Sequence, residues 1–295
     1  MAAVTAPGET IGPPRASGKR RRRWPAAMVA GWIVVLAGIS WWSVRHDPAT
    51  VPEQQELAQA MPALREATGT LLAAAQGGPW VVRLGTPRTS TCELTPVRDG
   101  TAAGQDVVVY VPEGQARTAL NEVAAALPGG YRAAVVPTRA GTRLSLFADA
   151  GHFIAIEAQA QAADQVLTLS VDTGCRPGTA DEAAAVPGAG TSAAVPGAGT
   201  AAAVPGTLAE TVAALGGTPG GGVAVQTIAC PGGGTAGTYR SVAGASGSGP
   251  RGVPSGVTLV WSGAGGWAYR NGSESVVVDA SGGKLQVSVT TACGQ

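Results

Sequence analysis

The chain has 295 residues and a formal net charge of +1, which averages two unlike parts. Residues 1–23 carry six cations against one carboxylate, a net charge of +5, whereas the other 14 cations and 18 carboxylates leave the rest at −4. A basic stretch this short is too small to fold, so it indicates anionic lipid headgroups and not nucleic acid as a partner. The favoured interpretation is that it acts only as a topology signal. Only 4% of the residues are aromatic, so any core must consist mainly of aliphatic side chains.

An apolar segment directly follows the basic stretch. Residues 26–44 contain no charged side chain, which is about the length that an α-helix needs to cross the hydrocarbon layer of a bilayer. Tryptophans and arginines mark the two membrane interfaces, as such residues commonly do; these are Trp24, Trp41, Trp42, Arg20, Arg21, Arg22 and Arg23. We predict a transmembrane helix over residues 24–44, retained as a signal-anchor because bulky residues occupy the place where a cleavage site would need small ones.

The basic flank also predicts the orientation of this helix. Cations accumulate on the cytoplasmic side of membrane-spanning helices, so residues 1–23 are expected to be a disordered cytoplasmic tail. The region from residue 45 to residue 295 is then extracytoplasmic, and the protein is a single-pass protein of the cell membrane.

The region 45–180 is predicted to be a first outer module. Apolar residues at steps of three and four predict helices, and alternating apolar residues predict strands. One helix is expected at Leu57–Ala75 and another at Glu113–Leu127. Pro62 is expected to kink or restart the first. The strands are expected at Trp80–Leu84, running on towards Cys92, and at Val107–Val111, Tyr131–Val136, Thr142–Phe147, Phe153–Glu157 and Gln165–Cys175.

Residues 181–206 are predicted to be a flexible linker, because Val-Pro-Gly recurs there every nine residues among Ala, Gly and Thr. A second outer module, 207–295, then repeats the first. Thr207 and Glu210 form a capping-box pattern for a short helix, and strands are expected at Val223–Cys230, Trp267–Arg270 and Ser275–Val278. Gly244–Gly256 is expected to be a loose loop.

The ends of the two modules match most closely. Residues 167–175 align without gaps on residues 285–293, so we infer an internal duplication. The expected fold class is α+β: a transmembrane helix followed by two related modules, each a mainly antiparallel sheet with one or two packed helices.

The four cysteines are Cys92, Cys175, Cys230 and Cys293, an even number in a compartment expected to be oxidising. Each module has one cysteine at the end of its first strand and one at the end of its last, and neighbouring strands lie within reach of a disulfide. Of the three possible connectivities, we predict Cys92–Cys175 and Cys230–Cys293. Metal binding is the poorer alternative because the cysteines are widely spaced and the sequence contains no CxxC motif.

Catalytic motifs are missing from the sequence. It contains no nucleophile elbow, zinc-protease motif, phosphate-binding loop or calcium loop, so no catalytic, cofactor-binding or metal-binding residue is predicted. His152 falls in a predicted turn, and Glu157 and Asp279 occupy matching strand ends of the two modules. Trp261, Trp267 and Tyr269 form the densest aromatic group, and they fit a sugar- or peptide-binding face and core packing of a strand pair equally well.

Lys19–Pro25, Trp41–Arg45 and the two strand-to-cysteine ends resemble a group of uncharacterised single-pass, signal-anchored envelope proteins of actinobacteria. The resemblance implies architecture and no activity. The expected function is a non-catalytic binding or scaffolding role in the cell envelope, with the bilayer and an envelope protein or cell-wall component as partners and no cofactor. The alternatives are a hydrolase acting on cell-wall material and a membrane sensor or regulator.

Overall fold

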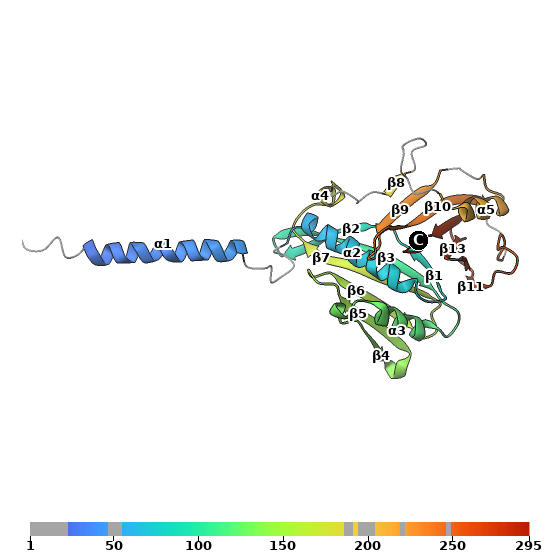
Figure 1. Cartoon of the computed structure of the whole chain (residues 1–295), viewed down its shortest axis with the longest axis horizontal. Coiled ribbons are helices and arrows are strands. Elements are labelled where there is room, and N and C mark those ends of the chain that lie inside the picture. Colours follow the sequence, from blue (N-terminus) through green and yellow to red (C-terminus); the bar gives the residue numbers. More distant parts are fainter. Residues whose placement is uncertain are drawn as a thin grey trace, which may run out of the picture. The chain divides into compact units, whose positions relative to one another are not determined.

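The computed structural model describes residues 23–46, 55–185, 191–193, 204–218, 222–245 and 249–294. The chain forms two units, Met1–Ala49 and Thr50–Gln295. The first contains helix α1 (Arg23–His46), and the second contains two antiparallel sheets with a few helices (Figure 1). The predicted α+β class is confirmed.

Helix α1 is apolar and exposed along its length. Its segment Trp24–Ser43 has a mean hydropathy of 1.6 and none of it is buried. The helix is therefore long and apolar enough to cross a membrane, and a signal sequence would have the same properties. Trp24, Trp41 and Trp42 are all at least 61% exposed, whereas Arg20 to Arg22 lie outside the described residues and of Arg23 only the backbone is described.

Sheet A is built from the first half of the second unit. Its strand order is β1-β3-β7-β6-β5-β4, and β2 also pairs with β3. Helices α2 (Leu57–Ala75) and α3 (Ala116–Ala126) bury one face of it, because the residues of its strands that alternate toward them are aliphatic. The strands are β1 (Val81–Leu84), β2 (Arg88–Thr95), β3 (Arg98–Tyr110), β4 (Ala134–Thr138), β5 (Arg143–Asp149), β6 (Ala155–Gln161) and β7 (Val166–Arg176).

Sheet B is built from the second half. Its order is β11-β12-β13-β14-β10-β9-β8, and helix α5 (Gly206–Ala214) covers one face through Leu208, Val212 and the adjacent Leu215. The strands are β8 (Thr191–Ala193), β9 (Ala224–Ala229), β10 (Thr235–Ala245), β11 (Leu259–Gly263), β12 (Gly266–Asn271), β13 (Glu274–Asp279) and β14 (Lys284–Thr290).

The two sheets share a strand order. The path β3-β7-β6-β5-β4 in sheet A corresponds to β10-β14-β13-β12-β11 in sheet B, and a helix precedes each set. The aligned strands β7 and β14 both bury alternate aliphatic residues. Helix α3 has no counterpart among the described residues of the second half. The topology therefore supports the duplication inferred from the sequence.

Several local predictions differ from the structure. Strand β10 was not predicted, because its small residues hide the alternation, and helix α2 does not restart at Pro62. The capping box is wrong: α5 begins after Pro205 without a side-chain cap, and the Thr207 hydroxyl instead accepts a hydrogen bond from Asn271. Within the predicted linker, β8 and helix α4 (Ala180–Ala185) are ordered elements, and α4 packs on the core through Ala183.

Strand β1 joins the two sheets. One of its edges pairs with β3, and its other edge meets polar side chains of sheet B. The amide of Val82 donates to the Ser275 hydroxyl at 3.1 Å, that of Leu84 donates to Thr238 at 3.2 Å, and Arg240 donates to the Leu84 carbonyl at 2.6 Å. These bonds satisfy a sheet edge that would otherwise be free to pair with another chain.

The two halves also share one hydrophobic core. Ile228, Cys230 and Ala236 of sheet B pack with α2 in the same cluster as the core of sheet A. The sequence predicted two outer modules, 45–180 and 207–295, joined by a flexible linker. Because residues Thr50–Gln295 form one compact unit with a common core, we expect the two halves to unfold as one cooperative unit.

Gly69 of α2 provides a test of this cooperativity. A Cβ at this position would collide with the Ala229 carbonyl oxygen of β9, so Gly69→Ala is expected to lower the free energy of unfolding by about 2 kcal/mol. Gly129→Ala, where a Cβ meets nothing, is the control. Urea denaturation should give a single transition in both variants, and two separate transitions in Gly69→Ala would show that the halves fold independently.

Candidate binding face on sheet A

The face of sheet A opposite its helices is covered by sheet B at Val81 and Tyr110. Over β5, β6, β7 and Asp106 of β3 this face is exposed and mainly polar, and we call this part the open face. Residues on β5, β6 and β7 alternate between buried and exposed, so the exposed ones share this side. Register pairs link Phe147, Glu157, Ser170 and Asp106 in one row across four strands. The open face comprises Arg143, Ser145, Phe147, Glu157, Gln159, Gln161, Thr168, Ser170, Asp172 and Asp106.

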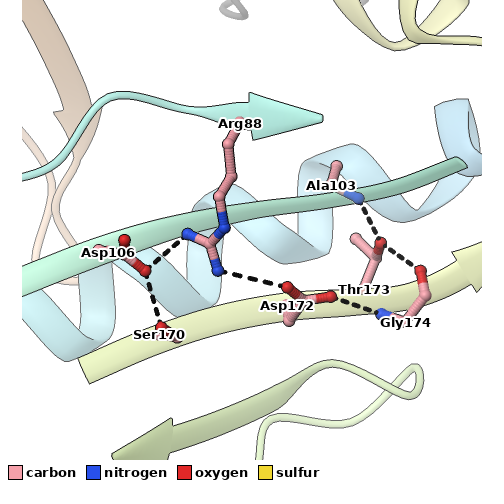
Figure 2. A network of polar contacts seen from close by, with 7 residues as sticks. All are labelled: Arg88, Ala103, Asp106, Ser170, Asp172, Thr173 and Gly174. Atoms are coloured by element: carbon pink, nitrogen blue, oxygen red, sulfur yellow. Dashed lines mark hydrogen bonds and ion pairs between the residues drawn. The ribbon is translucent and has the colours of Figure 1, made fainter. Parts of the chain in front are cut away.

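A network of charged groups lies at one side of the open face (Figure 2). The Arg88 guanidinium contacts Asp106 Oδ1 at 2.6 Å and Asp172 Oδ2 at 3.4 Å. The Ser170 hydroxyl donates to Asp106 Oδ1 at 2.8 Å. One guanidinium thus forms ion pairs with two carboxylates on different strands. Its positive charge offsets the repulsion between the two acids.

Gly104 makes this arrangement possible. It lies on β3 opposite Arg88 of β2 and opposite Asp172 of β7. A Cβ on Gly104 would come within 2.8 Å of Asp172 Oδ2 and 2.9 Å of Arg88 Nη2. The missing side chain therefore lets Arg88 reach across the central strand to a residue two strands away.

Asp172 also organises the end of β7. Its Oδ1 accepts a hydrogen bond from the amide of Gly174 at 3.0 Å, and the Thr173 hydroxyl accepts one from the amide of Ala103. These bonds lie at the register shift between β3 and β7 and directly before Cys175. Because the network pairs its carboxylates with a guanidinium, it suits a fixed polar binding surface better than proton transfer.

Both predicted disulfides are present, which confirms the pairing. Cys92–Cys175 has a Cα–Cα distance of 5.9 Å and Cys230–Cys293 one of 5.6 Å. The reason given for the pairing needs correction, since the joined segments are not neighbours. Cys92 and Cys175 lie on strands that flank β3, and Cys230 and Cys293 follow strands that flank β10. Each disulfide thus spans the strand that lies between its two cysteine-bearing segments, β3 in sheet A and β10 in sheet B, and the duplication extends to the crosslinks.

The second disulfide is also tied to helix α2. The side chain of Gln76, at the end of α2, accepts a hydrogen bond from the amide of Cys293 at 2.8 Å and donates one to the Thr291 carbonyl at 2.9 Å. Cys230 is itself buried in the shared core. The crosslink therefore lies where the end of the chain meets the first half.

His152 lies in an exposed turn, as predicted. It and Phe153 adopt left-handed backbone conformations with φ of 51° and 58°, which are costly for residues other than glycine. The buried Arg176 donates to both of their carbonyl oxygens, at 2.7 and 3.3 Å. The described contacts of His152 are made by its backbone, so they give this residue a structural role.

The prediction that Glu157 and Asp279 occupy matching strand ends is wrong. Glu157 lies opposite Ser170, and in the second half the residue opposite the equivalent Ser288 is Val277. Glu157 is exposed on the open face, whereas Asp279 lies 3.9 Å from Arg83 near the junction of the sheets. Partial burial opposes ionisation of Asp279, but hydrogen bonds from Ser281 and the charge of Arg83 outweigh it and hold the pKa of this carboxyl below its ordinary value. The two acids are on separate sheets and make no described contact with each other.

The lowered pKa of Asp279 predicts a pH dependence of stability. A carboxyl with a depressed folded-state pKa stabilises the fold above the pKa that it has when unfolded, and this stabilisation is lost as the pH falls through the folded-state value. Asp279→Asn should therefore lower the free energy of unfolding at pH 7 by under about 1 kcal/mol, because the pair is partly exposed. Urea denaturation at pH 7 and pH 3 should show a smaller acid-induced loss in this variant than in the wild type. Glu157→Gln, the matched control, should retain the wild-type loss.

The aromatic residues of sheet B divide between two environments. Trp267 and Tyr269 are at most 2% exposed in the core under α5, and the Tyr269 hydroxyl lies 3.0 Å from that of Thr211. Trp261 lies on the other face, with its ring centroid 5.1 Å from that of Tyr110. Core packing thus accounts for two of the three aromatics, and the third packs at the junction between the sheets.

Sequence reasoning did not identify the open face. Its signal was present in the polar residues that alternate with aliphatic ones along residues 143–149, 155–161 and 166–172. Alternation shows that one side of a strand is exposed, but it does not show which strands are neighbours. Among the described residues, no group of three or more His, Cys, Asp or Glu side chains has the arrangement of a metal site.

Comparison with known proteins gives little further information. No protein-family model matches the chain, and no curated protein matches it significantly. The chain has a weak structural similarity to a DUF4853 family protein from Actinomyces odontolyticus, with a TM-score of 0.32 and 14% sequence identity over 46% of this chain and 84% of that one. A similarity at this level supports no statement about function.

Proposed function

We propose that this chain is a single-pass protein of an actinobacterial cell envelope, anchored by α1 with its N-terminus in the cytoplasm. Its extracytoplasmic unit binds or scaffolds envelope material without catalysing a reaction. The observation that carries the proposal is an exposed apolar helix followed by a unit with two disulfides. Such a helix needs an apolar environment, and disulfides persist in oxidising compartments outside the cytoplasm.

The open face supports a binding role. It presents hydroxyls, amides and ion-paired charges on a sheet whose other face is buried by helices and whose strands are fixed by a disulfide. Rigid polar surfaces of this kind provide specific hydrogen bonds at low entropic cost. A hydrolase would require an acid or base held in a cleft, and the described contacts of His152 do not favour that alternative.

The test combines location with orientation. A phosphatase that is active only outside the cytoplasm, fused after residue 295, should be active, and the fusion should remain in the membrane after alkaline extraction. Replacing Lys19 and Arg20 to Arg23 with glutamine should reduce the activity by weakening the orientation signal. An inactive but well-expressed fusion would refute the orientation, and a soluble product lacking α1 would show that α1 is a cleaved signal sequence.

The non-catalytic part of the proposal needs a separate assay. The purified protein should release no product from peptidoglycan, ester or peptide substrates, but it should co-sediment with isolated cell walls. Turnover that is abolished by His152→Ala would favour the hydrolase alternative instead.

A further inference from the structure

A basic pocket lies at one end of the open face, where β5 begins and β6 ends. It has a volume of about 400 Å³, within the range of pockets that hold small molecules. Its lining is almost entirely polar and consists of Arg139, Thr142, Arg143, Gln159, Ala160, Gln161 and Asp164.

Two guanidinium groups dominate the charge of this pocket. Arg139 and Arg143 are exposed, and neither forms an ion pair with a carboxylate in the described part of the chain. Asp164 is the only acid in the lining, and Arg117 adds a third cation beside the turn. The groups facing the pocket therefore carry a net positive charge.

Hydrogen bonds hold these groups in place. Asp164 Oδ2 accepts from the amide of Gln161 at 2.7 Å, so this carboxylate is directed at the backbone. Arg143 Nη2 donates to Gln159 Oε1 at 3.1 Å, which leaves the Gln159 amide nitrogen available as a donor. Arg117 donates to the Gly141 carbonyl at 2.9 Å and braces the turn that carries Arg139. The pocket thus combines Arg143 and Gln159, which are held by their mutual hydrogen bond, with the exposed guanidinium of Arg139 on a braced turn, and its net charge is positive.

We propose that this pocket binds an oxyanion, the carboxylate or phosphate group of an acidic sugar. Guanidinium groups match the geometry of both anions with paired N–H donors, and the neighbouring glutamine and threonine side chains are suited to sugar hydroxyls. This inference rests on the proposed extracytoplasmic location, which would place the pocket among anionic envelope glycans.

The test uses the full-length protein in zwitterionic nanodiscs, titrated by calorimetry with glucuronate, inorganic phosphate and glucose. We expect glucuronate or phosphate to bind and glucose not to bind. Arg139→Gln and Arg143→Gln should each weaken anion binding by at least about tenfold, as expected for loss of a charge-assisted contact. Arg132→Gln is the matched control, because Arg132 is an exposed arginine in the connection before β4 that pairs with Asp149 outside the pocket. The affinity of this variant should stay within about twofold of the wild type.

The outcomes separate the two proposals. Loss of glucuronate binding in the pocket variants would assign a carboxylate ligand, and loss of phosphate binding would assign a phosphate ligand. If neither anion binds the wild type, or if both pocket variants bind as well as Arg132→Gln, the pocket is not the site. Membrane location and cell-wall sedimentation would then still hold in these variants if the proposed function is correct.

Discussion

Replacing both Cys230 and Cys293 with alanine is expected to lower the free energy of unfolding by about 4 kcal/mol. The two cysteines are 63 residues apart, and releasing a loop of this length returns that much conformational entropy to the unfolded chain in the chain-entropy estimate. The effect should extend to the whole unit Thr50–Gln295, because this disulfide lies beside α2 and Cys230 belongs to the shared core.

Denaturation of the oxidised variant and of the wild type, followed by tryptophan fluorescence, would measure this loss. The double variant Cys92→Ala/Cys175→Ala is the comparison, because its loop of 83 residues predicts a similar entropic loss of roughly 4.5 kcal/mol. A change below about 1 kcal/mol in the first variant would mean that the disulfide does not restrict the unfolded chain as the loop length predicts.

The second large effect is expected at Arg176, whose side chain is completely buried. Its guanidinium donates to the carbonyl oxygens of Thr173 and His152 and to the side chain of Gln55. Arg176→Met keeps the aliphatic volume but leaves these acceptors without their donor. Since each unsatisfied buried group costs roughly 1–3 kcal/mol, we expect the free energy of unfolding to fall by about 3 kcal/mol in total.

Thermal and urea denaturation would measure the effect, and limited proteolysis would locate it. Cleavage should increase at the strained turn around His152 and Phe153, which Arg176 holds. The control is Arg132→Met, which removes an arginine whose side chain is 79% exposed and should change stability by less than about 0.5 kcal/mol. Equal effects in the two variants would contradict a stabilising role for the buried guanidinium.

Much of the architecture was predictable because its signals are local. The apolar segment that became α1 is read from uninterrupted hydropathy, and Leu167, Leu169 and Val171 reveal their strand by simple alternation. The match between residues 167–175 and 285–293 predicted a duplication, which the common strand order supports. The cysteine pairing followed from this repeat, although each disulfide spans a strand that lies between its two cysteines. Of these strands, β10 was not predicted and β3 was predicted only at its end, from Val107.

Other features depend on contacts between residues far apart in the chain. The sequence by itself determined the apolar helix, the α+β class and the disulfide pairs, because periodicity, composition and repetition can be read from the order of the residues alone. Only the tertiary structure decided that β1 docks on sheet B, that Gly69 meets Ala229, and that Gly104 lets Arg88 reach Asp172. The physical reason is that strand order and side-chain proximity arise from packing between segments far apart in the chain, here 84 to 193 residues, which leaves no periodic trace in the sequence.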